Sequence, residues 1–155
     1  MIPKRTAWLA VLISVFMTQA GPAQARGGFE AGLGIAKDID GEEAGVATLA
    51  YLTEQKHPWE FIAGYFDQRR EAGMATVEDT FWFGVSKRLT WHGLYASFGV
   101  AYAQEDNEVL SDRLQFQSAV GYRGGDISVS LRHLSNGSIS GRNRGETFLL
   151  LHYAF

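Results

Sequence analysis

The stretch RLQFQSAVGY, residues 113–122, decides how the chain folds. Its side chains alternate between an apolar face and a polar one. The apolar face carries Leu114, Phe116, Val120 and Tyr122, and the polar face carries Arg113, Gln115, Gln117 and Gly121. A period of two residues is typical of a β-strand with one apolar face, whereas an amphipathic helix repeats every ~3.6 residues. The stretch is therefore predicted to be a strand.

The same alternation recurs along the chain and predicts an all-β protein with eight strands. The strands are expected at residues 28–37, 44–52, 59–67, 80–89, 93–104, 112–122, 127–135 and 146–155. These segments are long enough to cross a bilayer as tilted strands, which takes ~9–11 residues each.

The connections between the strands alternate in length. The short ones are 53–58, 90–92 and 123–126, and the connections between them are longer and polar. Bacterial outer-membrane barrels have short periplasmic turns and longer outer loops. The pattern therefore predicts an antiparallel transmembrane β-barrel of the outer-membrane type, with both ends of the chain on the periplasmic side.

A soluble eight-stranded barrel is the alternative, and it would turn its apolar face inward around a ligand. In this chain the face opposite the apolar one is largely Gly, Ala, Ser, Gln and Arg. Such side chains suit the filled, polar interior of a small membrane barrel. The last strand also ends on an aromatic residue, Phe155, which resembles the signal read by the outer-membrane assembly machinery.

The first 25 residues are predicted to be a cleaved signal peptide, which leaves residues 26–155 as the barrel. Lys4 and Arg5 precede an apolar run, and Ala23-Gln24-Ala25 fits a signal-peptidase site. The run is too short to span a bilayer as a helix, which takes ~20 residues.

Composition excludes several classes of function. The chain has a net charge of -3, and the predicted signal peptide holds basic residues but no acids. A nucleic-acid binder would instead show a basic patch. Without cysteine the chain has neither disulfides nor thiolate metal ligands. No metal site is expected, because the histidines show no ligand spacing: His57 and His92 fall in turns, and His152 is predicted to face inward.

One stretch carries residues for ester hydrolysis, which needs a nucleophile, a base and a group that orients the base. In the segment 127–135, His133 and Ser135 continue the apolar parity of Val129 and Leu131. Side chains two residues apart on a strand point to the same side. The two polar side chains are therefore predicted to face lipid at the outward end of the strand, where the abundant ester is the lipid of the outer leaflet.

The pattern His-x-Ser-Asn, followed about a dozen residues later by Glu, resembles the active-site motif of the outer-membrane lipid A 3-O-deacylases (PagL-type). The motif covers residues 132–146, and the general likeness in length and strand pattern covers the mature chain. The resemblance implies that Ser135 is the nucleophile, His133 the general base and Glu146 the group that orients His133. It also implies that Asn136 helps to form the oxyanion hole. It further implies a lipid A or lipopolysaccharide substrate in the Gram-negative outer membrane, with no metal or other cofactor.

Glu146 fits this scheme least well. Its parity is opposite to that of Leu149, Leu151 and Tyr153, so a regular strand would turn it into the barrel. Only a bulge or a loop conformation would bring its carboxylate to His133. With regular pairing, His133 and Ser135 would act as a dyad.

Other residues have simpler interpretations. Ser-Asn-Gly is also an ordinary turn sequence. Four arginines of the outer loops are either phosphate contacts or solvated charges: Arg69, Arg70, Arg142 and Arg144. Five aromatic residues are predicted to face lipid or the membrane interface: Trp59, Trp82, Trp91, Tyr102 and Tyr122.

Two competing functions remain open from the sequence. One is a non-catalytic small barrel with a structural or adhesive role. The other is a barrel acyltransferase that palmitoylates lipid A, although His-x-Ser-Asn favours hydrolysis. The sequence also leaves open a homodimer and the acyl length that the site accepts.

Overall fold

The computed structural model of the chain describes residues 27–37, 43–70, 76–104, 110, 112–139 and 145–155. The predicted signal peptide, residues 1–25, lies outside these residues. The long strands are β1 (Gly28–Lys37), β2 (Ala44–Leu52), β3 (Trp59–Phe66), β6 (Thr80–Trp91), β7 (Leu94–Ala103), β8 (Leu114–Gly124), β9 (Ile127–Ser135) and β10 (Glu146–Ala154). Two further strands of two residues each, β4 (Arg69–Arg70) and β5 (Thr76–Val77), pair only with each other.

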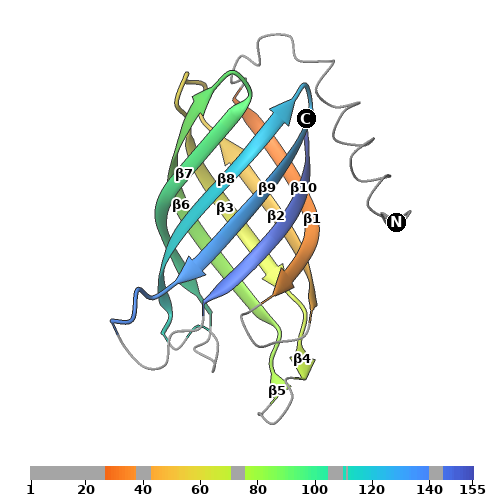
Figure 1. Cartoon of the computed structure of the whole chain (residues 1–155), viewed down its shortest axis with the longest axis vertical. Helices are drawn as coiled ribbons and strands as arrows, with labels where there is room; N and C mark the ends of the chain where they lie inside the picture. The colour runs from red at the N-terminus through yellow and green to blue at the C-terminus, as the bar shows by residue number, and fades with distance from the viewer. Residues whose placement is uncertain (1–26, 38–42, 71–75, 105–109, 111, 140–144) are drawn as a thin grey trace, which may run out of the picture.

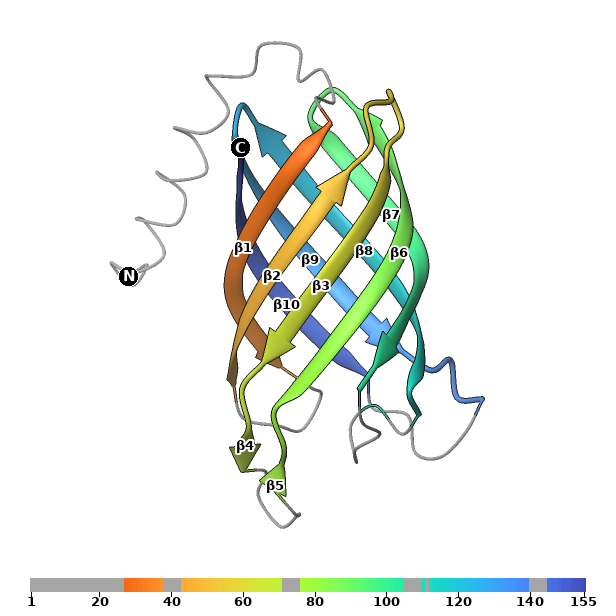
Figure 2. The ribbon, with the colours of Figure 1, turned by 180° about the vertical axis from the view of Figure 1, so that it is seen from behind.

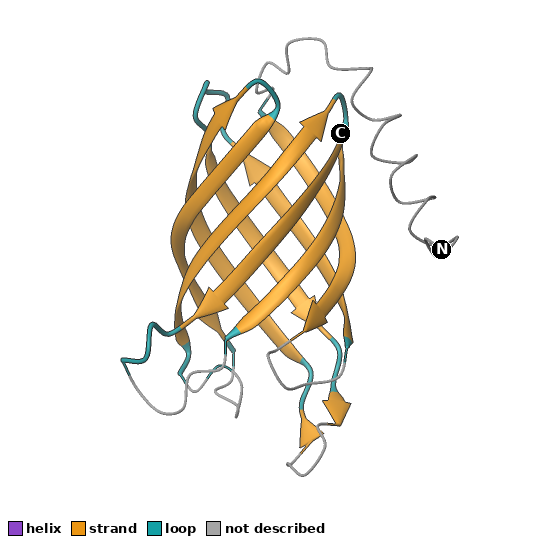
Figure 3. Ribbon diagram, in the orientation of Figure 1, coloured by secondary structure: helices purple, strands orange, loops and turns teal. Residues whose placement is uncertain are grey.

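The eight long strands form a closed antiparallel barrel in the order β1-β10-β9-β8-β7-β6-β3-β2 (Figures 1 and 3). β1 closes the barrel because it pairs with β2 on one edge and with β10 on the other. The predicted fold class is confirmed. The observed strand ends differ from the predicted ones by at most two residues, as at β6, which runs on to Trp91. The sequence did not predict β4 and β5.

The two ends of the barrel differ. Both ends of the chain's barrel portion lie at one rim, where the N–H of Phe29 donates to the carbonyl of Phe155 at 3.2 Å. The short β2–β3, β6–β7 and β8–β9 turns lie at this rim, called here the turn rim. The longer connections leave the opposite rim, the loop rim, beyond which β4 and β5 project (Figure 2). In the described part of the chain, no helix is long and apolar enough to cross a membrane.

Apolar side chains cover the outer wall of the barrel. Leu33, Phe98 and Phe83 are among the most exposed, at 70%, 63% and 62%. Contiguous apolar exposure on this scale does not suit a surface in water, and it is the lipid-facing band of a transmembrane barrel. Four of the five aromatic residues predicted for this surface lie on it: Trp59, Trp91 and Tyr102 are exposed, and Tyr122 is half-buried.

The prediction for Trp82 was wrong, because this side chain is completely buried inside the barrel. Strand parity decides the matter: the neighbours Phe81 and Phe83 face outward, so Trp82 faces inward. Its ring stacks on Phe148 with 5.8 Å between the centroids. Gly64, its partner on β3, makes room, since a Cβ there would lie 2.3 Å from the indole.

Side chains fill the barrel interior in two zones. Toward the loop rim the interior holds an apolar cluster that includes Phe66, Trp82, Leu110, Leu134 and Phe148. Toward the turn rim it is charged, with Glu30 and Glu60 bonded to Arg88, Arg123 and Arg132. The predicted polar interior is therefore correct for the turn-rim half. The loop-rim half contains an apolar plug of inward-facing aromatic and aliphatic residues, beside buried polar side chains such as Gln115, Gln117 and Glu146.

Candidate active site

Strand β9 presents the candidate residues on the outer wall at the loop rim. Arg132 and Leu134 are completely buried inside the barrel, and Arg132 donates to Glu60 at 2.7 Å and to Gln117 at 2.8 Å. Because successive side chains of a strand alternate between its faces, His133 and Ser135 lie on the outer face. Both are half-buried there, on the side that the sequence parity predicted.

Neighbouring strands place two hydroxyl groups beside His133. In the barrel register His133 pairs with Ser118 of β8 and with Thr147 of β10. Nδ1 of His133 lies 2.9 Å from Oγ1 of Thr147, which is a good hydrogen-bond distance. Ser135 pairs with Phe116 on β8.

Gly145 packs against the other edge of the imidazole. A Cβ at this position would lie 2.6 Å from Cε1 and 2.8 Å from Nε2 of His133. The φ angle of Gly145 is 68°, in the left-handed region that favours glycine. Two independent constraints, backbone conformation and space for His133, therefore require glycine here.

A tight turn follows Ser135 at the loop rim. The N–H of Gly137 donates to Oγ of Ser135 at 3.1 Å, and the N–H of Ser138 donates to Oδ1 of Asn136 at 2.9 Å. Asn136 is buried, at 1% exposure, and both Gly137 and Ser138 have positive φ. Within the described part of the chain, no hydrogen bond joins the side chains of His133 and Ser135, which share a face two residues apart.

Glu146 lies on the other side of the wall. It opens β10 in regular pairing with Leu134, the next pair is Thr147 with His133, and its side chain is completely buried. There is no bulge between these pairs to turn the carboxylate outward. The structure thus shows the regular geometry that the sequence parity indicated. Whether Glu146 serves as the acid group of the site stays a prediction.

Sequence reasoning missed Thr147 and Gly145, although the chain held a signal for each. Thr147 has the same parity as Leu149 and Leu151, so its outward position could have been predicted with theirs. Gly145 directly precedes a strand, a place where a glycine often marks a special backbone conformation.

The other described histidine candidates, His57 and His152, lie away from this site. The side chains of Arg69, Arg70, Arg142 and Arg144 are outside what the structure describes, so their predicted phosphate contacts stay predictions. His57 accepts from the N–H of Thr90 in a turn, and His152 lies 2.8 Å from Ser130 inside the barrel, as its parity predicted. Among the described residues, no three His, Cys, Asp or Glu side chains gather in a way that could hold a metal ion.

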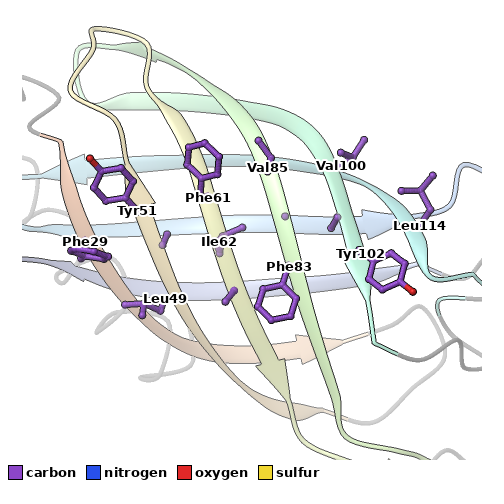
Figure 4. Close-up of a pocket in the computed structure, with 14 residues that line it drawn as sticks. Phe29, Leu49, Tyr51, Phe61, Ile62, Phe83, Val85, Val100, Tyr102 and Leu114 are labelled. Atoms are coloured by element: carbon purple, nitrogen blue, oxygen red, sulfur yellow. The ribbon is translucent and has the colours of Figure 1, made fainter.

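Two shallow apolar hollows mark the outer wall. One, of about 490 Å³, lies over β1–β3 and β6–β8 and contains none of the candidate residues (Figure 4). The other, of about 660 Å³, lies over β6–β10 and includes Val120, Leu131 and Leu149. On the same three strands, these residues lie two positions from Ser118, His133 and Thr147, on the side toward the turn rim. The second hollow therefore adjoins the candidate site.

Fold and site together define a transmembrane β-barrel of the outer-membrane type with a His–Ser pair on its outer wall. The family model described as Lipid A 3-O-deacylase (PagL) matches residues 39–155, and the chain belongs to this family. No curated protein sequence matches the chain. Among solved structures, the crystal structure of the outer membrane enzyme PagL has a similar fold, with a TM-score of 0.55 and 14% sequence identity. The match covers 82% of this chain and 97% of that one.

Proposed function

We propose that this chain is a lipid A 3-O-deacylase, which hydrolyses the ester-linked acyl chain at position 3 of lipid A in the outer leaflet. Family membership supports the reaction class. The observation that carries the proposal is the outward position of His133 and Ser135 on an apolar wall. Side chains there meet the membrane rather than the barrel interior, so the substrate is a lipid with its ester near the loop rim.

The adjoining hollow supports a lipid substrate. Acyl chains run from the headgroup toward the middle of the bilayer, and Val120, Leu131 and Leu149 lie on that side of His133. An apolar surface of this kind holds an acyl chain by van der Waals contact. The polar side chains beside it, His133 and Ser135, fix the position of the ester. Lipid A, or lipopolysaccharide, is therefore the proposed partner.

The proposed reaction passes through an acyl-enzyme. Oγ of Ser135 attacks the ester carbonyl carbon, and Nε2 of His133 accepts the serine proton. His133 then returns the proton to the sugar oxygen, which leaves as the free 3-hydroxyl. Water attacks the acyl-Ser135 ester in the same way, releasing a fatty acid and the free serine. The Ser135–His133 hydrogen bond needs to form only when substrate is bound, because such bonds are often long in a free enzyme.

Charge on the tetrahedral intermediate needs hydrogen-bond donors near Ser135. Asn136 is the proposed side-chain contributor, since it follows Ser135 directly. The N–H of Gly137, which points at Oγ of Ser135 from 3.1 Å, is a backbone donor in the right neighbourhood. Glu146 remains a candidate acid group from the family resemblance alone, and its carboxylate starts from the interior side of the wall.

We further propose the location of the protein. Residues 1–25 direct export and are removed, and the barrel crosses the Gram-negative outer membrane with its turn rim in the periplasm. The turn that follows Ser135, residues 136–139, then lies at the outer face of the membrane, level with the headgroups of the outer leaflet. The proposed chemistry involves no metal or other cofactor.

The test is an assay of the barrel refolded in detergent micelles with purified lipid A, in which the released fatty acid is measured. Ser135→Ala and His133→Ala should each abolish release, because triad members act as a unit and loss of either disables the step. Assembly of each variant is checked by the mobility of the unheated barrel on a gel. Full release by Ser135→Ala would eliminate the nucleophile assignment. An assembled but inactive wild type would favour the structural or adhesive alternative.

A further inference from the structure

The proposed base must keep one imidazole nitrogen unprotonated and turned toward Ser135. In the structure the other nitrogen, Nδ1, has a partner: Oγ1 of Thr147 at 2.9 Å. Resting on the function proposed above, we propose that Thr147 is the positioning residue for His133, and that it fills the place which the family resemblance gives to Glu146. Thr147 does not touch the reacting atoms; it acts through the imidazole.

The register makes this contact a fixed feature of the barrel. Thr147 and His133 are direct partners on β10 and β9, and both are half-buried on the outer face. A β-branched side chain has few allowed χ1 values, so the hydroxyl direction is restricted. A hydroxyl both donates and accepts hydrogen bonds, so it can accept from Nδ1–H whether the imidazole is neutral or protonated.

The proposal gives this contact a direction, with Nδ1–H of His133 as the donor and Oγ1 of Thr147 as the acceptor. When Nδ1–H donates to Oγ1 of Thr147, the lone pair of the neutral ring lies on Nε2. The Cε1–Nε2 edge packs against Gly145, which directly precedes the Glu146–Leu134 pair. Since Ser135 directly follows Leu134 on β9, this edge is turned toward the end of the strand that carries Ser135. The ring is thus held at Nδ1 and bounded by Gly145 near Nε2, which leaves Nε2 as the atom that takes the Ser135 proton in the proposed mechanism.

The chemistry of the wall explains why a hydroxyl occupies this position. An ionised carboxylate is costly to place against hydrocarbon, whereas a hydroxyl with a hydrogen-bond partner is much less so. The adjacent carboxylate, Glu146, is completely buried on the interior side. A neutral acceptor stabilises the protonated imidazole less than a carboxylate does, so the contribution of Thr147 should equal that of one neutral hydrogen bond.

Three variants test the proposal by kinetics. Thr147→Val keeps the shape and removes the hydroxyl, and kcat should fall roughly 3- to 10-fold with KM within about twofold, as expected for one neutral hydrogen bond. Thr147→Ser restores the hydroxyl and should bring kcat back to within about twofold of wild type. Ser118→Ala is the matched control, because Ser118 is the other hydroxyl paired with His133 and has no hydrogen bond to it among the described residues. It should leave kcat unchanged.

A second measurement reports the imidazole directly. Long-range ¹H–¹⁵N spectra in micelles, assigned with His133→Ala, should show Nδ1 protonated and Nε2 unprotonated in wild type and in Thr147→Ser. Thr147→Val should lose this preference. An unchanged kcat in Thr147→Val, an equal loss in Ser118→Ala, or a wild-type ring protonated at Nε2 would overturn the proposal. If Thr147→Val fails to assemble, the wild-type tautomer and the Thr147→Ser rate decide.

Failure of the proposed function looks different. A wild type that releases no fatty acid, or a Ser135→Ala variant that releases as much as wild type, overturns the deacylase mechanism and the positioning role with it. An active wild type with an inactive Ser135→Ala and a fully active Thr147→Val overturns the role of Thr147 alone.

Discussion

At the scale of single residues, Glu146 and Thr147 at the start of β10 face opposite sides of the wall. Glu146 is completely buried inside, and Thr147 lies outside beside His133. The strand period fixes this difference, because a shift by one residue would exchange every inward and outward side chain of β10. Such a shift would also drive Phe148 and Leu150 out of the interior, so the apolar plug keeps Thr147 beside His133.

Gly145→Ala should lower kcat by roughly 10- to 100-fold, because a displaced catalytic group loses its alignment. The added Cβ would lie 2.6 Å from Cε1 of His133 and would push the ring away. The control is Gly125→Ala in the β8–β9 turn, which has a similar φ of 63° but no atom within 4 Å of the added Cβ. An equal loss of kcat in the two variants would mean that backbone strain, not contact with His133, is responsible. An unchanged kcat in Gly145→Ala would contradict the role of this contact.

Glu146→Gln should lower kcat less than Thr147→Val does, because the carboxylate is on the interior side of the wall and Nδ1 of His133 is bonded to Thr147. Both variants are compared in the same micelle assay after assembly is checked. An inactive Glu146→Gln beside a fully active Thr147→Val would give the orienting role to Glu146, as the family resemblance implies.

At the scale of strands, alternation predicts almost everything that depends on one strand alone. It places all eight long strands and the outward phase of His133 and Ser135. It failed where residue type was weighed above parity: Trp82 was expected at the membrane but fills the interior beside Phe148. Cross-strand neighbours such as Thr147 beside His133 depend on the register between strands, which the sequence pattern alone does not state.

A matched pair on β10 tests the two faces of the wall. Leu150 is completely buried inside the barrel, and its neighbour Leu151 is 58% exposed on the outer wall. Leu150→Ala should lower the free energy of unfolding by about 2–5 kcal/mol, because it leaves a cavity. Leu151→Ala should cost much less, since hydrocarbon or detergent fills the space. Urea unfolding of the refolded barrel measures both, and equal losses would contradict the assigned inward and outward faces.

At the scale of the whole molecule, charged side chains in the turn-rim half of the interior connect strands that are distant in sequence. Glu60 of β3 accepts from Arg88 of β6 and from Arg132 of β9. Glu30 of β1 accepts from Arg88 and from Arg123 of β8. These contacts cross the barrel and hold Arg132, the residue before His133, in place. The interior ion pairs therefore help to fix the segment of β9 that carries His133 on the outer wall.

Glu60→Ala should lower the free energy of unfolding by about 3–5 kcal/mol, because it leaves the buried guanidinium groups of Arg88 and Arg132 without their shared carboxylate. The control is Glu43→Ala, which removes an exposed carboxylate just before β2 and should change stability by less than about 0.5 kcal/mol. Urea unfolding in micelles again gives both values. A Glu60→Ala barrel as stable as wild type would show that the interior charges are compensated without Glu60.

Mass spectrometry of lipid A from Gram-negative cells that express the chain tests the central claim most directly. Wild type should yield lipid A that lacks one ester-linked acyl chain, and fragmentation should place the loss at position 3. Cells that express Ser135→Ala, with the barrel assembled in the outer membrane at the same level, should keep the full set of acyl chains. Lipid A left intact by an assembled wild-type barrel, or shortened equally by Ser135→Ala, would contradict the account.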